Sequence, residues 1–254
     1  MLTAITREPA RSLERCELSY VERRAIDAGR AAAQHREYRR ALGECGARVV
    51  ALPAAEELPD SVFVEDTAVV LDELAILASP GVASRRAEVP LVEAELARHR
   101  RLVRVELPAT LEGGDVLRVG RRLFVGLTPR TNRAGVEALR ALSAPYGYEV
   151  VPVVPRGCLH LKTACTAVGD GTILLNPEWV DPAHFREYER LAVHPSEPWA
   201  ANTARVGLHL LVGAAFPRTA ELLTRRSLAV RPVDVSEFAK AEGGLTCMSL
   251  ILDG

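Results

Sequence analysis

The sequence predicts an α/β fold in which about five similar units are arranged radially and close into one domain. A β-hairpin, a helix and a short strand recur at intervals of about 45–50 residues, the period of a repeat architecture. The tight hairpins create many antiparallel pairs, which disfavours the alternative of a doubly wound α/β sheet. The length of 254 residues, 48% of them hydrophobic, suits one large domain or two small ones, and we interpret residues 1–254 as one.

The N-terminal part is expected to supply the first unit of the radial arrangement and the strand with which the last strand of the chain pairs. The expected elements are a strand at 2–6, a polar loop at 11–19, a helix at 20–42 and a strand at 47–52. Ser19 is the expected N-cap of the helix, and Gly43 lies near its end. If the last strand of the chain pairs with residues 2–6, the domain has no exposed terminal edge.

The second and third units follow the same order of elements. For the second unit we expect strands at 62–64, 68–71 and 74–77, a helix at 83–99 and a strand at 102–107. For the third we expect strands at 115–119 and 123–127, a helix that Asn132 caps and that runs to Leu142, and a strand at 148–154. Asp72-Glu73 and Gly120-Arg121 are the expected hairpin turns.

The fourth and fifth units complete the repeat. The fourth is predicted to have strands at 162–168 and 172–175 around Gly169-Asp170-Gly171, and a helix opened by Asp181 and Pro182. It is the weakest repeat, because Pro195 and Pro198 interrupt its third strand. The fifth is predicted to have strands at 204–206 and 209–212, a helix at 219–226 and a strand at 228–233.

Composition excludes several classes of partner. The net charge is −1 without a basic block, which argues against nucleic acid and against an anionic membrane. Aromatic residues make up 5%, too few for a base-stacking platform, and no apolar run is long enough to span a membrane. Five widely spaced cysteines do not form a disulfide framework, so we expect a reducing cytoplasm.

One stretch near the C-terminus suggests a nucleophile. Residues 242–252 (EGGLTCMSLIL) place Cys247 just after Gly243-Gly244, where positive φ is easy, and at the start of an apolar strand. A thiol at that position would be reachable while its strand is held by the core, as a nucleophile requires. The alternative is a small buried hydrophobic residue, the usual state of a free cysteine.

Chemically active residues recur where each hairpin begins. The residues concerned are Asp60, Glu65, Asp66, Glu112, His160 and Cys247. If the units surround an axis, these side chains converge, and crowded carboxylates call for a cation such as a planar guanidinium. Taken singly, each acid also fits a loop or capping role, and His160 a structural one. The Gly113-Gly114 and Gly243-Gly244 pairs lack phosphate-loop spacing and are expected where backbones approach closely.

Four motifs in order resemble a known family. Residues 61–67 (SVFVEDT), 111–115 (LEGGD), 158–163 (CLHLKT) and 244–247 (GLTC) are similar to those of dimethylarginine dimethylaminohydrolase. That family belongs with arginine deiminase to the guanidine-modifying superfamily. The resemblance implies a five-unit α/β propeller (pentein), which agrees with the repeat count.

The resemblance also implies roles for individual residues. Cys247 would be the nucleophile and His160 the general acid and base. Glu112, Glu65 and Asp66 would hold the substrate guanidinium, and Arg85 and Arg130 its α-carboxylate, with the adjacent Arg86 and Arg133 as alternatives. Asp60 and the main-chain carbonyls of Leu18 and Ala241 would receive the α-amino group, with the loop around Leu18 acting as a lid.

The implied reaction is hydrolysis of Nω,Nω-dimethyl-L-arginine, or of the monomethyl form, to citrulline and dimethylamine or methylamine. It would pass through a covalent thiouronium on Cys247, without a metal or organic cofactor, in a monomer or a homodimer. Zinc would enter only as an inhibitor, bound by Cys247 and His160. Cys158 and Cys165 flank His160 without the spacing of a structural zinc site.

One position separates this reading from its nearest alternative. Deiminases of arginine and agmatine usually carry His-x-Asp, whereas the third residue here is Lys162, which leaves one carboxylate fewer and more room for an alkylated nitrogen. The alternatives that remain are an arginine deiminase-like hydrolase that releases ammonia, and a module that binds guanidines without catalysis.

Overall fold

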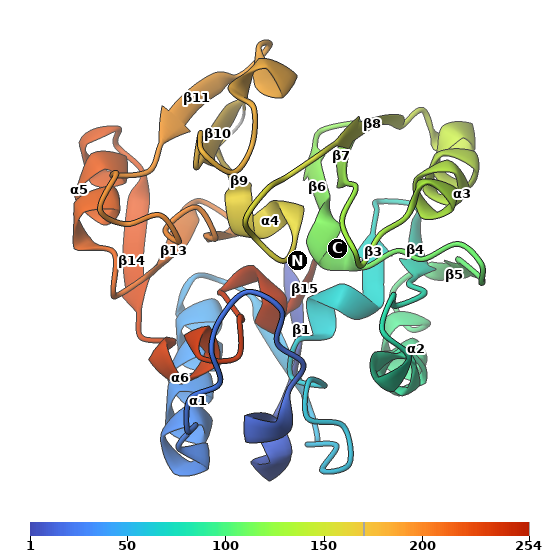
Figure 1. Cartoon of the computed structure of the whole chain (residues 1–254), viewed down its shortest axis with the longest axis horizontal. Coiled ribbons are helices and arrows are strands. Elements are labelled where there is room, and N and C mark those ends of the chain that lie inside the picture. The colour runs from blue at the N-terminus through green and yellow to red at the C-terminus, as the bar shows by residue number, and fades with distance from the viewer. Residues whose placement is uncertain (170, 254) are drawn as a thin grey trace.

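Five small sheets surround a common centre (Figure 1). Within residues 1–169 and 171–253, which the computed structural model describes, fifteen strands form these five three-stranded sheets. In every sheet the middle strand pairs antiparallel with one neighbour and parallel with the other. The predicted five-unit α/β propeller is confirmed, and the described residues form no continuous doubly wound sheet.

The first sheet joins the two ends of the chain. It consists of β15 (Leu250–Leu252), β1 (Thr3–Arg7) and β2 (Arg48–Leu52). Thr3 pairs with Leu252, so the predicted closure is confirmed. The other sheets are β3 (Ala68–Val70), β4 (Leu74–Leu77) and β5 (Arg101–Arg104); β6 (Val116–Val119), β7 (Arg122–Gly126) and β8 (Glu149–Val153); β9 (Cys165–Gly169), β10 (Thr172–Leu175) and β11 (Glu189–Ala192); β12 (Ala204–Val206), β13 (His209–Gly213) and β14 (Ala229–Val233).

Each parallel pair requires a crossover, because the chain must return to the same end of the sheet. The crossovers are α1 (Ala28–Glu44), α2 (Pro90–Leu96), α3 (Arg133–Ser143), the 3-10 helix Pro182–Phe185 and α5 (Pro217–Arg225). The longer helices lie at the outer rim, and the start of each hairpin lies toward the centre (Figure 1). The helices therefore cover the sheets from outside and leave the axis to the hairpin starts.

The first helix begins later than predicted. The expected helix at 20–42 is α1, which starts at Ala28 with Asp27 as N-cap, and Ser19 does not cap it. The Asp27 side chain accepts from Arg30 N at 2.9 Å. The N–H groups of Ser19–Val21 instead donate to the side chain of Glu242, so a contact distant in sequence overrides local helix propensity.

The expected helix at 83–99 is interrupted. A 3-10 helix covers Ala83–Glu88, and α2 starts at Pro90. Proline has no N–H for the preceding turn but suits the first position of a helix, so one predicted helix becomes two short ones. The predicted loop at 11–19 likewise contains a 3-10 helix, Arg11–Arg15.

The predicted strand at 62–64 is wrong, because Val62 lies in a turn and Val64 begins the 3-10 helix Val64–Thr67. Two other predicted strands begin with a helical turn. Residues 161–164 form α4 (Leu161–Ala164) ahead of β9, so Lys162 is not on a strand. Cys247 lies on the 3-10 helix Thr246–Met248, before β15 rather than in it. Of the predicted turn at 169–171, Asp170 lies outside the described residues.

The fourth unit is complete despite its prolines. β11 ends at Ala192, ahead of Pro195 and Pro198, and pairs parallel with β10. Apolar side chains fill the spaces around the sheets in five clusters of the described residues. No helix in residues 1–169 and 171–253 has the length and apolar character needed to cross a bilayer.

Candidate active site

Short helical turns converge at the centre, one ahead of the hairpin in each of four units. They are the 3-10 helices Val64–Thr67, Gly113–Asp115 and Thr246–Met248, together with α4. The turn at Val64–Thr67 packs against both other 3-10 helices, and the turn at Gly113–Asp115 also packs against α4. These turns bring acids, an imidazole and a thiol from separate units into one buried group.

Glycines permit this approach of one backbone to another. A Cβ on Gly113 would lie 2.0 Å from the carbonyl oxygen of Glu65, and a Cβ on Gly114 would lie 2.7 Å from Nδ1 of His160. A Cβ on Gly243 would lie 2.3 Å from the ring of Phe63. The prediction of close backbone approach is confirmed at Gly113, whose Cβ would meet main-chain oxygens; Gly243 and Gly244 instead lie against the side chains of Phe63 and Asn202. Neither Gly243 nor Gly244 has a positive φ; the residue that does is Glu242, with φ of 57°.

His160 is held between two acids. Its Nε2 lies 2.7 Å from Oε2 of Glu112, and its Nδ1 lies 3.8 Å from Oδ1 of Asp66. Burial alone would lower the pKa of His160, but Asp66, Asp115 and Glu112 outweigh it and raise the pKa to about 9. The imidazole is therefore protonated at neutral pH and can donate a proton.

Asp115 fixes the position of His160, a role that the sequence did not reveal. Its Oδ1 accepts from Leu161 N at 3.0 Å, and its Oδ2 accepts from Oγ1 of Thr128 at 2.7 Å. The first bond holds the turn immediately after His160. Burial raises the pKa of Asp115 to about 6, although His160 and the hydrogen bonds oppose the rise.

Arg85 lies within the acid cluster. Its Nη1 donates to Oδ2 of Asp66 at 2.7 Å, while Nε and Nη2 donate to Glu88 at 3.1 and 2.8 Å. Burial would raise the pKa of Asp66, but His160 and Arg85 outweigh burial and lower the pKa to about 2. Arg85 thus supplies the crowded acids with a cation from within the protein.

Arg130 has a free donor beside the same cluster. Its Nη1 lies 3.6 Å from Oε1 of Glu112, too far for a hydrogen bond, and is buried without a partner among the described residues. Arg133 is exposed at the start of α3, and Arg86 donates to the carbonyl of Pro80 at 3.1 Å. The structure thus brings Arg85 and Arg130 into the site and leaves the two alternatives outside it.

Glu65 supports the Cys247 turn. One of its carboxylate oxygens accepts from Lys162, and the other accepts from Oγ1 of Thr246 at 2.6 Å. Asn202, which sequence reasoning missed, accepts from Thr246 N at 3.1 Å and donates to the carbonyl of Lys162 at 3.0 Å. Burial raises the pKa of Glu65, with Lys162 opposing the rise. Both oxygens of Glu65 are thus engaged by protein groups.

Cys247 is a neutral thiol in this arrangement. Burial, Glu65 and Asp66 together raise its pKa to about 12, although Gly244 N donates to Sγ at 3.3 Å and Lys162 is nearby. The negative charge of Asp66 raises the pKa of both the thiol and His160. A bound cation near Asp66 would favour the thiolate, because it would offset the acids that now oppose ionisation.

The three residues predicted to receive the α-amino group lie on or near the N-terminal loop. Asp60 is buried and accepts from Glu17 N at 3.1 Å. Leu18, the residue after Glu17, is half-buried and packs against the core cluster that contains Ala241. Burial raises the pKa of Asp60, and Arg85 opposes the rise. These three residues flank the segment that Glu242 holds.

One group has the spacing of a metal site. Among the described residues, Asp66, Glu112 and His160 each present a ligand atom within 4.8 Å of the others. Arg85 and the protonated His160 already neutralise these acids. The donor set therefore suits an organic cation that can share several hydrogen bonds at least as well as a bare metal ion.

Comparison with known proteins identifies relatives over the whole chain. The family model described as N,N dimethylarginine dimethylhydrolase, eukaryotic, matches residues 15–196. N(G),N(G)-dimethylarginine dimethylaminohydrolase of Streptomyces coelicolor is 41% identical over 250 residues, which are 98% of this chain and 96% of the relative.

Solved structures agree. A mutant of DDAH from Pseudomonas aeruginosa, in which serine replaces a cysteine, was solved with citrulline. It has a TM-score of 0.95 at 34% identity and covers 99% of this chain and 100% of its own. The N-terminal domain of ArgZ, a cyanobacterial arginine dihydrolase, has a TM-score of 0.86 at 21% identity, covering 99% and 98% of the two chains, a likeness of fold.

Gly114→Ala tests the close approach at the axis. The added Cβ would be 2.6 Å from Oδ1 of Asp66 as well as crowding His160, so we expect a loss of roughly 1–3 kcal/mol in the free energy of unfolding. Gly43→Ala in α1 is the control: its Cβ meets nothing within 4 Å, and we expect a gain of about 0.5–1 kcal/mol. Denaturant unfolding measures both; equal effects would contradict the packing argument.

The protonation state of Cys247 is tested by alkylation in the absence of substrate. Because burial and two carboxylates raise the thiol pKa to about 12, the reaction with iodoacetamide should be slow at pH 7 and still accelerating above pH 9. Mass spectrometry locates the modified cysteine and gives its rate at each pH. A plateau reached near neutral pH would show that the thiolate exists before any ligand binds.

Proposed function

The chain belongs to the N,N-dimethylarginine dimethylaminohydrolase family, and we propose that it hydrolyses Nω,Nω-dimethyl-L-arginine, and the monomethyl form, to L-citrulline and dimethylamine or methylamine. The observation that carries this proposal is the buried group of Asp66, Glu112 and His160, with Cys247 in the field of the same acid. Hydrolysis of an amidine carbon–nitrogen bond needs acids that bind the cation, a proton donor and a nucleophile, and these four residues supply all three.

The substrate guanidinium takes the place that Arg85 holds at Asp66. Arg85 is anchored by two hydrogen bonds to Glu88 and touches Asp66 through Nη1 alone. Substrate binding thus exchanges one charge-assisted hydrogen bond for another, at little electrostatic cost. Glu112 is the second acid within reach of the planar cation, and Glu65 supports Cys247 from behind through Thr246.

The amino acid end of the substrate binds between two arginines and the N-terminal loop. Nη1 of Arg130 is buried without a hydrogen bond, and Arg85 gains a free Nη1 when it leaves Asp66. Both donors suit the α-carboxylate. Asp60 and the carbonyls of Leu18 and Ala241 receive the α-amino group, which is supported by the burial of Asp60 and by the proximity of the Leu18 loop to Asp60.

The first half-reaction forms a bond to sulfur. The bound guanidinium lowers the pKa of Cys247, the thiol proton is released, and the thiolate attacks the central carbon. Protonated His160 then donates its proton to the dimethylamino nitrogen, the carbon–nitrogen bond breaks, and dimethylamine leaves. A thiouronium cation remains attached to Cys247.

The second half-reaction uses the same imidazole as a base. Neutral His160 takes a proton from water, the hydroxide attacks the thiouronium carbon, and the carbon–sulfur bond breaks. As the carbon–sulfur bond breaks, the added oxygen loses its remaining proton to the departing sulfur, so citrulline leaves, Cys247 returns to the thiol and His160 has regained its proton. The proton that the thiol released to water in the first half-reaction is thereby replaced, and no metal or organic cofactor takes part in the proposed chemistry.

The proposal extends to surroundings and assembly. A reducing cytoplasm is supported by five cysteines that are all buried and unpaired. A homodimer is supported by Leu208, whose side chain is 85% exposed in the turn between β12 and β13 and offers an apolar contact to a second copy. The mass measured by light scattering distinguishes the dimer from a monomer.

Amine release decides between this proposal and an arginine deiminase. The purified protein is incubated with dimethylarginine, arginine and agmatine, and released dimethylamine and ammonia are measured. We expect dimethylamine from the first substrate and little ammonia from the others. Cys247→Ser should abolish turnover, whereas Cys45→Ser, a change at another buried cysteine, should retain it. Ammonia from arginine as the main product would favour the deiminase.

Arg130→Ala tests carboxylate recognition. Loss of a charge-assisted hydrogen bond should raise KM for dimethylarginine roughly tenfold or more, with a smaller effect on kcat. The same variant should barely affect turnover of the decarboxylated analogue, dimethylagmatine. Arg133→Ala, on the exposed start of α3, is the matched control and should behave like the wild type. An equal loss of activity with both substrates would contradict a role for Arg130 in binding the carboxylate.

A further inference from the structure

One side chain binds three consecutive N–H groups of the N-terminal loop. Oε1 of Glu242 accepts from the backbone N–H groups of Ser19 and Val21 at 2.9 and 2.7 Å, and also from that of Tyr20. Glu242 is buried, and its other carboxylate oxygen has no partner among the described residues. Three consecutive N–H groups on one oxygen form an anion-binding nest, here occupied by a carboxylate from the far end of the chain.

The backbone at Glu242 is held in an unfavourable conformation for this contact. Its φ of 57° lies in the left-handed region, where a glycine would be relaxed and a side chain costs free energy. Glycine follows at 243 and 244, yet glutamate occupies the strained position. A non-glycine residue persists there because its surroundings compensate, and the three hydrogen bonds supply that compensation.

The contact determines where the carbonyl of Leu18 points. The N–H of Ser19 and the C=O of Leu18 belong to one planar trans peptide unit, in which the two groups point in opposite directions. When Glu242 holds the Ser19 N–H, it therefore also sets the direction of the Leu18 oxygen. Under the proposed function, on which this inference rests, that oxygen receives the α-amino group of the substrate.

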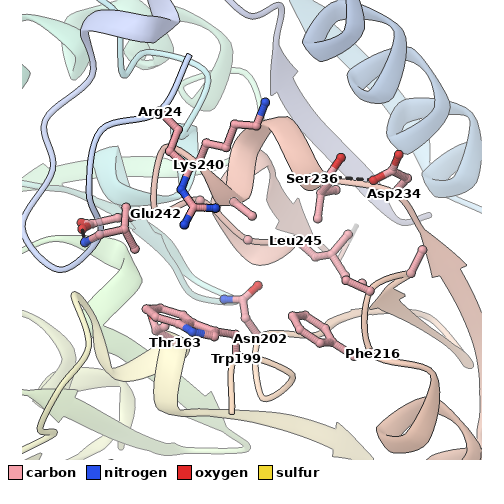
Figure 2. Close-up of a pocket in the computed structure, with 18 of the residues that line it drawn as sticks. Arg24, Thr163, Trp199, Asn202, Phe216, Asp234, Ser236, Lys240, Glu242 and Leu245 are labelled. Carbon is pink, nitrogen blue, oxygen red and sulfur yellow. Dashed lines mark hydrogen bonds between the residues drawn. The ribbon is translucent and has the colours of Figure 1, made fainter. Parts of the chain in front are cut away.

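Two other polar side chains near Glu242 also form hydrogen bonds with the loop. Nζ of Lys240 donates to the carbonyl of Ala25 at 3.0 Å, and Glu237 accepts from Asp27 N at 3.0 Å. Beside these contacts lies a cavity of about 590 Å³, and Figure 2 shows Arg24, Lys240 and Glu242 on its wall. Leu18 and Ile26 pack against the core at the two ends of this stretch, whereas Val21, Glu22 and Arg24 border the hollow, so hydrogen bonds hold the part between.

We propose that Glu242 is a positioning residue: it latches the loop over the site and aims the carbonyl of Leu18 at the α-amino group of the substrate. The residue touches no reacting atom. Its effect is confined to recognition of the amino group and to closure of the loop. Substrates without the amino group should therefore gain little from the latch.

The test compares dimethylarginine with its deamino analogue, the dimethylguanidino acid of the same chain length. Glu242→Gly removes the carboxylate but also relaxes the backbone, so relief of strain offsets part of the lost hydrogen bonding and the variant should still fold. Its kcat/KM for dimethylarginine should fall about 10- to 100-fold, chiefly through KM, while the value for the deamino analogue changes little. Glu242→Gln, which keeps the shape without the charge, should lie between.

Glu22→Gln is the matched control, because Glu22 is an exposed acid of the same loop and changes the charge equally. It should retain the wild-type preference for the amino group. Unchanged preference in Glu242→Gly, or an equal loss in Glu22→Gln, would overturn the proposal.

A second measurement needs no turnover, so that failure of the latch and failure of the proposed function can be told apart. Native trypsin cleavage after Arg23 and Arg24 reports opening of the loop. Cleavage should be at least tenfold faster in Glu242→Gly than in the wild type and unchanged in Glu22→Gln. Equal cleavage rates in all three proteins would refute the latch, whatever the substrate proves to be.

Discussion

The site depends on how closely the chain can approach itself at the axis. Gly113 and Gly114 leave no room for a Cβ between the turn at Val64–Thr67 and His160, and Gly243 lies against Phe63 in the same way. Four of the five units contribute a short helical turn, so the distances between acid, imidazole and thiol are set by how closely these turns pack. Catalytic groups placed in this way need little reorganisation when substrate binds.

This crowding makes the electrostatics of the site unusual. Burial opposes the charge on every group, yet Asp66 remains ionised because His160 and Arg85 are positive, and Cys247 remains neutral because burial and the nearby acids both oppose the thiolate. In the proposed mechanism, a guanidinium that replaces Arg85 keeps the balance at Asp66 and adds positive charge where the sulfur must ionise. The substrate would then supply the charge that the thiolate needs, so that the thiol ionises only when its target is bound.

The local sequence predicted the recurring strands and helices of the fold. Contacts between residues far apart in the sequence determined the features that it did not predict. The strands at 172–175 and 204–206 follow from alternation and turn residues, and their bounds agree with β10 and β12. Residues 20–27 suit a helix by composition, but the N–H groups of Tyr20 and Val21 donate to Glu242, which lies more than 200 positions away. Motifs and convergence indicated Cys247 and His160, whereas Asp115 and Asn202 act through contacts that no local signal displays.

The charged groups of a buried site must be held in place, and the site must also open to admit its ligand. Different parts of the structure meet these two requirements. The acids, His160 and Cys247 lie on tightly packed turns, while the proposed site of the α-amino group includes a loop held by hydrogen bonds and by the packing of Leu18 and Ile26. Because hydrogen bonds exchange with water at small net cost, such a loop can open without disturbing the core. A strained Glu242 next to Ala241 links the two parts, since the segment that leads to the nucleophile also holds the loop closed.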